Sequence, residues 1–499
     1  MGELIVRLAG FVFIGIVLFF YYLSQAIHTP ANSDYAAIIL EAKSILEGNI
    51  FLSGWHLSTV SYYTTEIPIY VIGIILFGFN HNLLYIVPCC IYTLTVAAAL
   101  WVVYNKEQSK GTFAAFCLLG IPVGLFCLVL TGPIHIVAIC FSIVCIKLLQ
   151  YAQQNKVFYL YFGLLFCWTL IGDTIALWVI GIPVVLAGIY RIYLNPRQWK
   201  GEIIPPLIIV ASVVVSKVTL KLISTLGGFS VPGTGDAMFA ELAVMGRNIY
   251  STTYGLLEMF NANFFGKPIG SLQTMKLLLH FGGMLLVLYI VGIFVYQMFK
   301  KKEIDYINQI LSISVFITIS SYLISNMNLG TDTSRYLIPV VIFGGILVGR
   351  HFNSFTWTLQ KQRLYIAGII LYAVSMLSPI SFQRAPNQFD RVIPLLQSHG
   401  LKYGYASYWL ASPITLFSNG DIQVRQVIAP SETMQPYEFL SDKEWYDAPA
   451  NFVIFDKSGW GSVHRNSAVK AFGEPFKELT FEDMTILVWD KDISPYLKK

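Results

Sequence analysis

The chain has 499 residues, of which 56% are hydrophobic and only 12% are charged. Soluble globular proteins carry about 25% charged residues, so this chain has too few charges to cover a water-exposed surface of its size. The composition excludes a cytosolic enzyme, a secreted disulfide scaffold and a disordered regulator, and it predicts a polytopic α-helical membrane protein.

The charged residues are concentrated near the C-terminus. Residues 381–499 contain 26 charged side chains, whereas the first 380 residues contain only 35. This shift predicts a transmembrane domain over residues 1–380 and a small soluble domain over residues 381–499. The net charge of +5 comes from the membrane part and is typical of basic loops at a membrane surface, so nothing indicates a nucleic-acid partner.

Twelve apolar runs are long enough, or nearly long enough, to cross about 30 Å of hydrocarbon. In chain order they lie at 8–26, 60–79, 83–104, 112–131, 133–149, 157–172, 174–193, 203–223, 277–299, 309–326, 336–350 and 364–380. Each run predicts one transmembrane helix.

Three basic loops, at 191–200, 300–302 and 350–363, indicate the cytoplasmic side by the positive-inside rule. Loops 27–66 and 224–275 and the C-terminal domain then lie outside. Twelve crossings would return the C-terminal domain to the cytoplasm. We therefore expect eleven or thirteen transmembrane helices, with the exception inside the stretch 83–149, where prolines interrupt short runs.

Both outer loops contain predicted helices. In segment 34–47, apolar and charged residues alternate as in an amphipathic helix that lies on the membrane surface. Segment 236–265 has a similar character. The C-terminal domain alternates strand-like and helical patterns, which predicts an α/β fold. Its expected strands are 451–455 and 484–489, and its expected helices are 389–399 and 462–472.

Asp34 follows the first apolar run and precedes the helix expected at 34–47. A carboxylate at the membrane interface is partly desolvated, which raises its pKa toward the range of a general base. Ser33 and Asp34 before an apolar run are also typical of a helix N-cap. The local pattern alone favours the cap over the base.

Glu66 stands at the outer end of the second apolar run. Ionisable groups at the edge of a bilayer are functional candidates, because such positions are unfavourable for them. An interfacial glutamate in water is an equal alternative. The nearby His56, Tyr62 and Tyr63 are candidates for a sugar-binding site or for an aromatic belt at the membrane interface.

Four more ionisable residues are candidates. Asp173 interrupts a long apolar stretch, and the preceding glycine favours a solvated turn over a buried carboxylate; His135 is open to the same two interpretations. Arg335 lies at the outer end of a run, where a guanidinium can bind a phosphate, although snorkelling or a pair with Asp332 is an alternative. Arg247 is a weaker candidate of the same kind.

The C-terminal domain contains one distinctive aromatic stretch at 403–420. Tyr405, Tyr408 and Trp409 within it are predicted to pack in the domain core rather than to face a ligand. The sequence contains no Walker loop, Rossmann fingerprint, HExxH or Gly-x-Ser-x-Gly motif, so it does not indicate a nucleotide-driven pump.

With these residues in view, the whole chain resembles the GT-C membrane glycosyltransferases. Within them it is most similar to the branch of protein O-mannosyltransferases and aminoarabinose lipid A transferases. The likeness rests on short motifs around the outer loops and on the outer C-terminal domain. The motifs are Asp34 followed by a helix and Leu46-Glu47-Gly48-Asn49, Gly54-Trp55, Tyr62-Tyr63, Glu66-Ile67-Pro68, Leu76-Phe77-Gly78 and Arg335-Tyr336 before Pro339.

The resemblance implies an inverting transfer of a sugar from a polyprenyl-phosphate carrier to an acceptor hydroxyl or amine outside the plasma membrane. It implies Asp34 as the catalytic base. The aminoarabinose branch has a lysine where this chain has Ile67, so binding of the lipid phosphate falls to Arg335, Arg247 or another group. We expect the other substrate-binding residues to be Glu66, His56, Tyr62, Tyr63 and Asp173.

The resemblance leaves open which sugar is moved, whether the acceptor is a glycan, a lipid or a protein, and whether a divalent cation is needed. A transporter or flippase for a lipid-linked saccharide is the alternative, and it would call for paired charges in mid-membrane and internal repeats. A scaffold for envelope assembly is a third reading, and it would tolerate Asp34→Asn. The absence of an Asn-x-Ser/Thr sequon favours a prokaryotic source.

Overall fold

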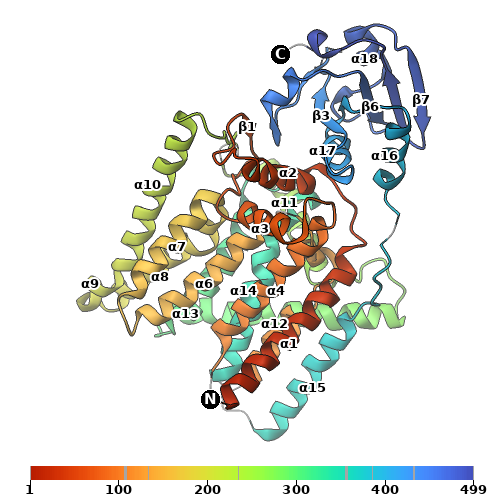
Figure 1. Ribbon diagram of the computed structural model, residues 1–499. Helices are drawn as coiled ribbons and strands as arrows, with labels where there is room; N and C mark the ends of the chain where they lie inside the picture. Colours follow the sequence, from red (N-terminus) through yellow and green to blue (C-terminus); the bar gives the residue numbers. More distant parts are fainter. Residues whose placement is uncertain are drawn as a thin grey trace.

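The structure is a computed structural model that describes residues 2–105, 110–132, 134–233, 235, 237–354, 358–384, 386–430 and 433–497. Most of the chain forms a body of packed helices, and the C-terminal residues form a sheet domain at one end of it (Figure 1). The long helices of the body are α1 (Gly2–Ala26), α4 (Leu83–Val103), α5 (Lys110–Leu119), α6 (Ile136–Ala152), α7 (Phe158–Gly172), α8 (Ile182–Leu194), α10 (Ile204–Thr225), α12 (Leu272–Phe299), α13 (Tyr306–Ile324), α14 (Ile338–Ser354) and α15 (Leu359–Met376).

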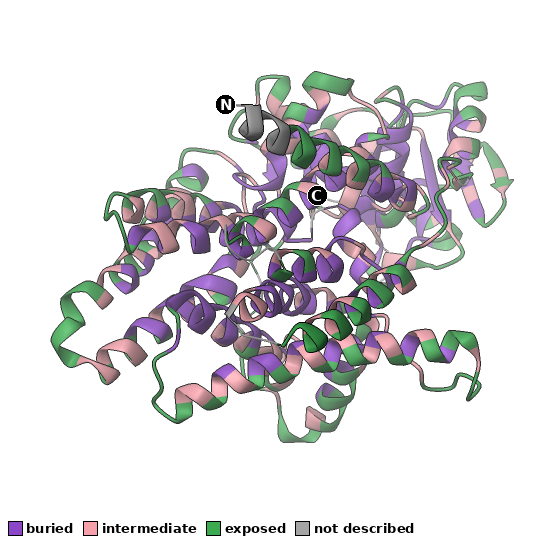
Figure 2. Ribbon diagram, turned by 90° about the horizontal axis from the view of Figure 1, so that it is seen from below, coloured by how far each residue is buried: buried purple, intermediate pink, exposed green. Residues whose placement is uncertain are grey.

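Seven helices in the described ranges are long and apolar enough to cross a membrane, and an eighth crossing results if α5 and the bent 3₁₀ segment η1 (Gly124–Leu130) count as one. Apolar side chains are exposed on the outer helices, for example Phe13 on α1 and Val214 on α10. Figure 2 shows buried residues gathered in the middle of the helical body and exposed ones along its margins. Since such apolar faces require lipid, the chain is a multi-pass membrane protein. The expected total of eleven or thirteen crossings stays a prediction.

The apolar run at 60–79 does not form a transmembrane helix. It contains α3 (Glu66–Phe77), which has 12 residues. At 1.5 Å per residue, α3 is about 18 Å long, too short for a bilayer core of about 30 Å. The His81 ring, just beyond α3, stacks on Phe417 of the C-terminal domain with centroids 4.5 Å apart. Inside 83–149, where the exception to the expected count was predicted, α5 and η1 are bent by 93° and do not form one straight membrane-crossing helix.

The helix expected at 34–47 forms as α2 (Ser33–Leu46), but it does not lie on an open membrane surface. Its residues from Ala36 to Ala42 are buried. Helix α17 (Tyr408–Phe417) of the C-terminal domain packs against α2 from one side, and α3 packs against it from the other (Figure 1). The outer segment expected at 236–265 contains α11 (Met245–Met259).

The C-terminal domain is a mixed α/β fold, as expected. Its six-stranded sheet has the order β4-β3-β2-β6-β8-β7, in which β3, β2 and β6 are parallel and β8 and β7 are antiparallel to their neighbours. The strands are β2 (Tyr403–Ala406), β3 (Gln423–Ile428), β4 (Gln435–Pro436), β6 (Phe452–Asp456), β7 (Lys477–Phe481) and β8 (Met484–Val488), and the other helices are α16 (Gln388–Ser398) and α18 (Arg465–Phe472). Because α15 ends at Met376 and α16 begins at Gln388, the segment between them separates the helical body from this domain.

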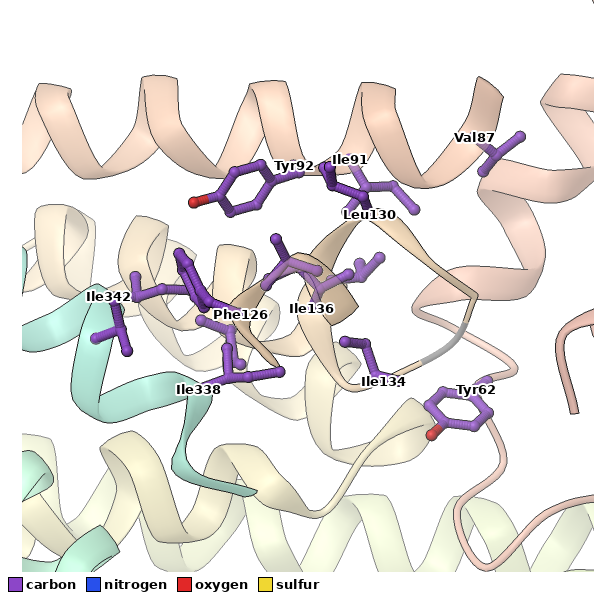
Figure 3. Packing of buried hydrophobic residues seen from close by; sticks show 14 of the residues in the cluster. Tyr62, Val87, Ile91, Tyr92, Phe126, Leu130, Ile134, Ile136, Ile338 and Ile342 are labelled. Carbon is purple, nitrogen blue, oxygen red and sulfur yellow. The ribbon is translucent and has the colours of Figure 1, made fainter. Parts of the chain in front are cut away.

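The two parts of the chain are joined by more than this connector. Strand β1 (Trp55–His56) of the first outer loop pairs in antiparallel fashion with β5 (Ser441–Asp442) of the C-terminal domain. One cluster of buried apolar residues continues from the helical body into the domain, where it includes Phe389 and Leu410. Figure 3 shows its inner part, in which Tyr92 of α4 and Phe126 of η1 meet edge to face with ring centroids 5.9 Å apart. The domain is thus packed on the outer loops and is not freely tethered.

Candidate active site

Asp34 lies in the first turn of α2, and its carboxyl does not cap the helix. The N-cap of α2 is Asn32, whose side chain accepts a hydrogen bond from the Tyr35 backbone N–H at 3.0 Å. The expectation that Ser33 and Asp34 form the cap is therefore wrong, because Asn32 satisfies that role one residue earlier. The positive end of the helix dipole still favours a carboxylate at this position.

The C-terminal domain supplies a direct partner for Asp34. The Tyr408 hydroxyl donates a hydrogen bond to the Asp34 carboxylate, and the Ser33 hydroxyl donates one to the Tyr408 backbone carbonyl. Burial raises the pKa of Asp34, while the Tyr408 hydrogen bond and the positive charge of Arg335 act in the opposite direction. Asp34 remains half-buried, so an approaching acceptor can reach it.

Arg335 is the cation whose charge acts on the Asp34 carboxyl. It lies in the 3₁₀ segment η5 (Thr331–Leu337), and its guanidinium is 5.6 Å from the centroid of the Tyr336 ring. Within the described part of the chain, its buried Nε atom has no hydrogen-bond partner and the side chain does not pair with Asp332, which is exposed. The charge of Arg335 acts on both Asp34 and Tyr62. Among the described residues, the Nε donor of Arg335 is thus unused.

A buried polar pair lies on the other side of Tyr62. Asp173, which follows α7, is only 1% exposed, and its Oδ2 is 2.7 Å from His135 Nδ1. Its Oδ1 accepts a hydrogen bond from the Ile175 backbone N–H at 2.9 Å. The solvated turn that the sequence favours for Asp173 is therefore wrong. The reason is tertiary: the Tyr62 N–H donates to the carbonyl of Gly172 at 2.8 Å, so the outer loop covers this end of α7.

Glu66 is also an interior group and not an interfacial residue in water. It is 1% exposed at the start of α3. Its Oε1 accepts a hydrogen bond of 3.3 Å from the Val137 backbone N–H, at the N-terminus of α6. Its buried Oε2 has no partner among the residues that the structure describes. Both Asp173 and His135 act on it electrostatically, so the three groups form one cluster.

A cavity of about 180 Å³ opens beside this cluster. His135, Asp173 and Tyr336 line it on one side, and α13 and the π-helical segment η2 (Leu177–Gly181) line it on the other. Its hydroxyl-bearing residues include Thr318 and Ser321, and Trp178 contributes an apolar wall. The rings of Tyr62 and Tyr336 flank His135, with centroid separations of 5.9 Å and 5.5 Å.

Three residues that the sequence made candidates do not join this cluster. His56 pairs with Glu438 at 3.0 Å, where β1 meets the C-terminal domain. The Tyr63 hydroxyl donates to the carbonyl of Ile50 at 2.9 Å, so it is used to hold the outer loop. Arg247 is exposed on α11. Residues that lie close together in the sequence can therefore have side chains that point in different directions in the fold.

Sequence reasoning missed the role of Tyr408. The aromatic stretch at 403–420 draws attention to it, and its ring is indeed buried, 3% exposed, among Tyr437, Phe439 and Trp460. Nothing in the local pattern indicates that its hydroxyl reaches a carboxyl on α2. Only the packing of α17 on α2 brings them together.

A metal site does not emerge from these residues. Over the described ranges, no three His, Cys, Asp or Glu side chains come close enough together to hold one ion.

No protein-family model matches the chain, and no curated protein matches it. Among solved structures, the helical body with its C-terminal domain matches the GT-C fold, as the sequence led us to expect. The structure that shows this is the apo form of an oligosaccharyltransferase from Archaeoglobus fulgidus. The two align with a TM-score of 0.50 and 11% identity, over 92% of this chain and 71% of that chain.

Two further crystal structures of the same archaeal protein are also similar. The complex with Zn and sulfate aligns with a TM-score of 0.48 and 10% identity over 89% of this chain and 68% of that chain. The form tethered through a disulfide bond to an acceptor peptide containing the NVT sequon aligns with a TM-score of 0.45 and 12% identity over 93% and 71%. At such identities the comparison establishes the fold alone, and the likeness to the O-mannosyltransferase and aminoarabinose branch stays a prediction.

Proposed function

We propose that this chain is an integral-membrane inverting glycosyltransferase that moves a sugar from a polyprenyl-phosphate carrier to an acceptor hydroxyl or amine outside the membrane. The observation that carries the proposal is the electrostatic interaction between a half-buried carboxyl, Asp34, and a guanidinium with an unused donor, Arg335. Such a transfer needs a base for the acceptor proton and a cation for the departing phosphate. The fold shared with an oligosaccharyltransferase supports a glycan as the transferred group.

Asp34 serves as the base in this mechanism. The acceptor oxygen attacks the anomeric carbon from the face opposite the phosphate, while its proton passes to the free oxygen of the Asp34 carboxylate. The bond from the anomeric carbon to the phosphate oxygen breaks in the same displacement, so the configuration inverts. Because burial raises the pKa of Asp34, the carboxylate is a stronger base than one in water. A positioned base contributes about 10²- to 10⁴-fold in rate.

Arg335 stabilises the leaving group. The polyprenyl phosphate departs as an anion and needs no proton, but it needs positive charge where its oxygens lie. In this proposal the phosphosugar binds in the cavity beside Tyr336, which Asp173 also lines. The acceptor then approaches from the C-terminal domain, where Asp34 meets Tyr408.

The side of the membrane on which this occurs follows from the basic loops. The Tyr190 hydroxyl donates to the carbonyl of Lys302 at 3.1 Å, and Arg350 pairs with Asp305 at 2.7 Å, so the three basic loops meet at one end of the body. The C-terminal domain contacts the opposite end (Figure 1). By the positive-inside rule, the domain is extracytoplasmic.

The proposal is tested by incubating membranes that contain the protein with radiolabelled polyprenyl-phosphate sugars and identifying what becomes labelled. Wild type is compared with Asp34→Asn, which removes the base but keeps the shape and one acceptor oxygen. We expect the transfer rate of Asp34→Asn to fall by about 10²- to 10⁴-fold.

Asp332→Asn is the matched control, since Asp332 is an exposed carboxyl in the same segment as Arg335. We expect it to label acceptor at the wild-type rate. Equal labelling by wild type and Asp34→Asn would remove Asp34 as the base. No labelling with any donor would favour the transporter for lipid-linked saccharides.

A further inference from the structure

The cavity beside Tyr336 is polar, but its wall holds an acidic and not a basic side chain. Among the described residues that line it, none is a lysine or an arginine, and the Asp173 carboxyl is part of the wall. An anionic group in this cavity would therefore lie beside a carboxyl without a cation to balance it. The cavity thus suits the sugar ring of a phosphosugar, whose phosphate Arg335 takes in the proposed function.

His135 is held in one orientation at this cavity. It precedes α6 with a backbone φ of 70°, in the left-handed region that few non-glycine residues adopt. It is 6% exposed, and its Nδ1 lies 2.7 Å from Asp173 Oδ2. Asp173 is itself fixed, because its Oδ1 accepts a hydrogen bond from the Ile175 backbone N–H. Strained, well-held residues of this kind concentrate at functional sites.

The second ring nitrogen of His135 is a hydrogen-bond acceptor in this arrangement. A neutral imidazole donates from one nitrogen and accepts at the other. Since the Asp173 carboxylate can only accept, the Nδ1–H of His135 donates to it and Nε2 keeps its lone pair. Across the described residues, none forms a hydrogen bond with Nε2, although His135 lines the cavity. A hydroxyl group of a ligand is the partner that such a nitrogen accepts from.

Several hydroxyl groups of the cavity have already used their protons. Thr318 donates to the carbonyl of Ser314 at 2.8 Å, and Ser321 donates to that of Thr318 at 3.2 Å. The Tyr322 hydroxyl donates to the carbonyl of Gly330 at 2.8 Å. These oxygens can therefore offer a ligand only their lone pairs. A ligand with many O–H donors, such as a sugar, matches them, whereas a carboxylate or a phosphate does not.

We propose that this cavity is the subsite for an uncharged sugar, in which His135 Nε2 accepts a hydrogen bond from one sugar hydroxyl and Asp173 is the positioning residue. This inference rests on the proposed function and adds the class of sugar to it. Thr59 and Thr174 line the same cavity with hydroxyls that can donate or accept, as the remaining sugar hydroxyls require. Trp178 adds an apolar wall for the carbon face of the ring.

The test measures what the sugar adds to binding. The purified full-length protein in detergent is titrated with polyprenyl phosphate that carries no sugar, and with polyprenyl phosphates that carry glucose, mannose, galactose or glucuronic acid. The gain is the dissociation constant for the bare lipid phosphate divided by that for the sugar-bearing one. In wild type, we expect a gain of about 10-fold or more for at least one uncharged sugar, and no gain for glucuronic acid.

His135→Asn removes the acceptor and keeps the surrounding arrangement. Asparagine tolerates the left-handed backbone, and its amide can still donate to Asp173, but its side chain ends short of the Nε2 position. We expect the gain from the uncharged sugar to fall about 10-fold, while the affinity for bare polyprenyl phosphate stays at the wild-type value. His399→Asn is the matched control, because His399 is exposed in the C-terminal domain. Both of its affinities should equal those of wild type.

Asp173→Asn tests the positioning role. The asparagine amide can donate to His135 Nδ1, which places the ring proton on Nε2 and turns the acceptor into a donor. The same substitution removes the carboxyl from the cavity wall. We therefore expect the gain for the uncharged sugar to fall and glucuronic acid to become the preferred sugar. A merely structural role of Asp173 would not reverse this preference.

The outcomes separate this inference from the proposed function. Equal gains in wild type and His135→Asn would show that His135 does not bind the sugar. Equal binding of the glucuronic acid and uncharged-sugar lipids by wild type would show that the cavity does not select an uncharged sugar. In either case, or if no uncharged sugar adds to binding, the inference fails and the glycosyltransferase assignment stands. If wild type does not bind polyprenyl phosphate at all, the proposed function fails as well.

Discussion

The hydroxyl of Tyr408 donates a hydrogen bond to the carboxylate of Asp34 although 374 residues separate the two in the chain. One residue comes from the first outer loop of the membrane body and the other from the C-terminal domain. The domain is therefore part of the proposed site, since it holds one oxygen of the base and leaves the other for the acceptor. Four predictions follow from this arrangement and from the buried groups around it.

Tyr408→Phe should reduce the ionised fraction of the Asp34 base at acidic pH without removing the base. The phenol hydrogen bond lowers the pKa of Asp34, so its loss raises that pKa further. A higher pKa leaves less carboxylate at a given acidic pH, and the acid limb of the kcat/KM profile should move to higher pH by about one unit. We expect the rate loss to be largest on the acid limb and to disappear at higher pH.

Tyr437→Phe is the control for this substitution. Tyr437 packs on Tyr408 with ring centroids 5.5 Å apart. Across the described ranges, its hydroxyl forms no hydrogen bond with Asp34. Its profile should match wild type. An unshifted acid limb in Tyr408→Phe would show that Tyr408 does not act on the base.

Arg335→Ala should impair transfer far more than Arg247→Ala. Arg335 is half-buried and acts on Asp34, whereas Arg247 is exposed on α11. Losing a preorganised charge opposite the leaving phosphate typically lowers kcat by about 10²-fold or more. Steady-state transfer assays on the two variants check this. A larger effect of Arg247→Ala would return the phosphate-binding role to α11.

Glu41 should make the protein less stable as the pH rises. Burial raises the pKa of Glu41 on α2 to about 8, and within the described residues its Oε1 has no partner. The unfolded chain ionises this group near its ordinary pKa while the folded chain keeps the proton. The stability therefore falls between about pH 4.5 and pH 8 and then levels off.

Glu41→Gln removes this dependence. Relative to wild type it should gain about 3 kcal/mol in the free energy of unfolding at pH 7, and its Tm should change less between pH 5 and pH 8. Thermal unfolding in detergent across this range is the measurement. Glu47→Gln, at the exposed end of the same region, should follow wild type. Parallel pH curves for wild type and Glu41→Gln would mean that Glu41 is not buried in solution.

Trp55→Ala should loosen the C-terminal domain. Trp55 is 1% exposed, its ring lies 4.9 Å from that of Trp445, and its Nε1 donates to Ser44 at 3.1 Å. Truncating a buried tryptophan costs about 3–5 kcal/mol. We expect faster proteolysis at the connector before α16 and lower transfer, because Tyr408 would no longer be held at Asp34. Trp199→Ala, on an exposed position of α9 (Trp199–Glu202), should leave both unchanged.

Several features could be predicted from the sequence because they depend only on residues that are close together in the chain. Apolar composition over a window of about twenty residues indicates a membrane helix wherever the rest of the chain lies. The alternation at 451–455 and 484–489 likewise indicates strands, which form as β6 and β8. The GT-C-type fold could be expected from short motifs around Asp34 and Arg335, and the comparison with a solved structure supports it.

By itself, the amino-acid sequence determined that this is a multi-pass membrane protein with a small α/β domain at its C-terminus. Only the tertiary structure decided that the run at 60–79 is too short a helix to cross, that Asp173 is buried against His135, and that Tyr408 reaches Asp34. The physical reason is that hydropathy and periodicity, which predict helices and strands, depend only on residues that are neighbours in the chain. Burial, ion pairing and hydrogen-bond partners depend instead on which distant segments pack together, and α17 on α2 is such a contact.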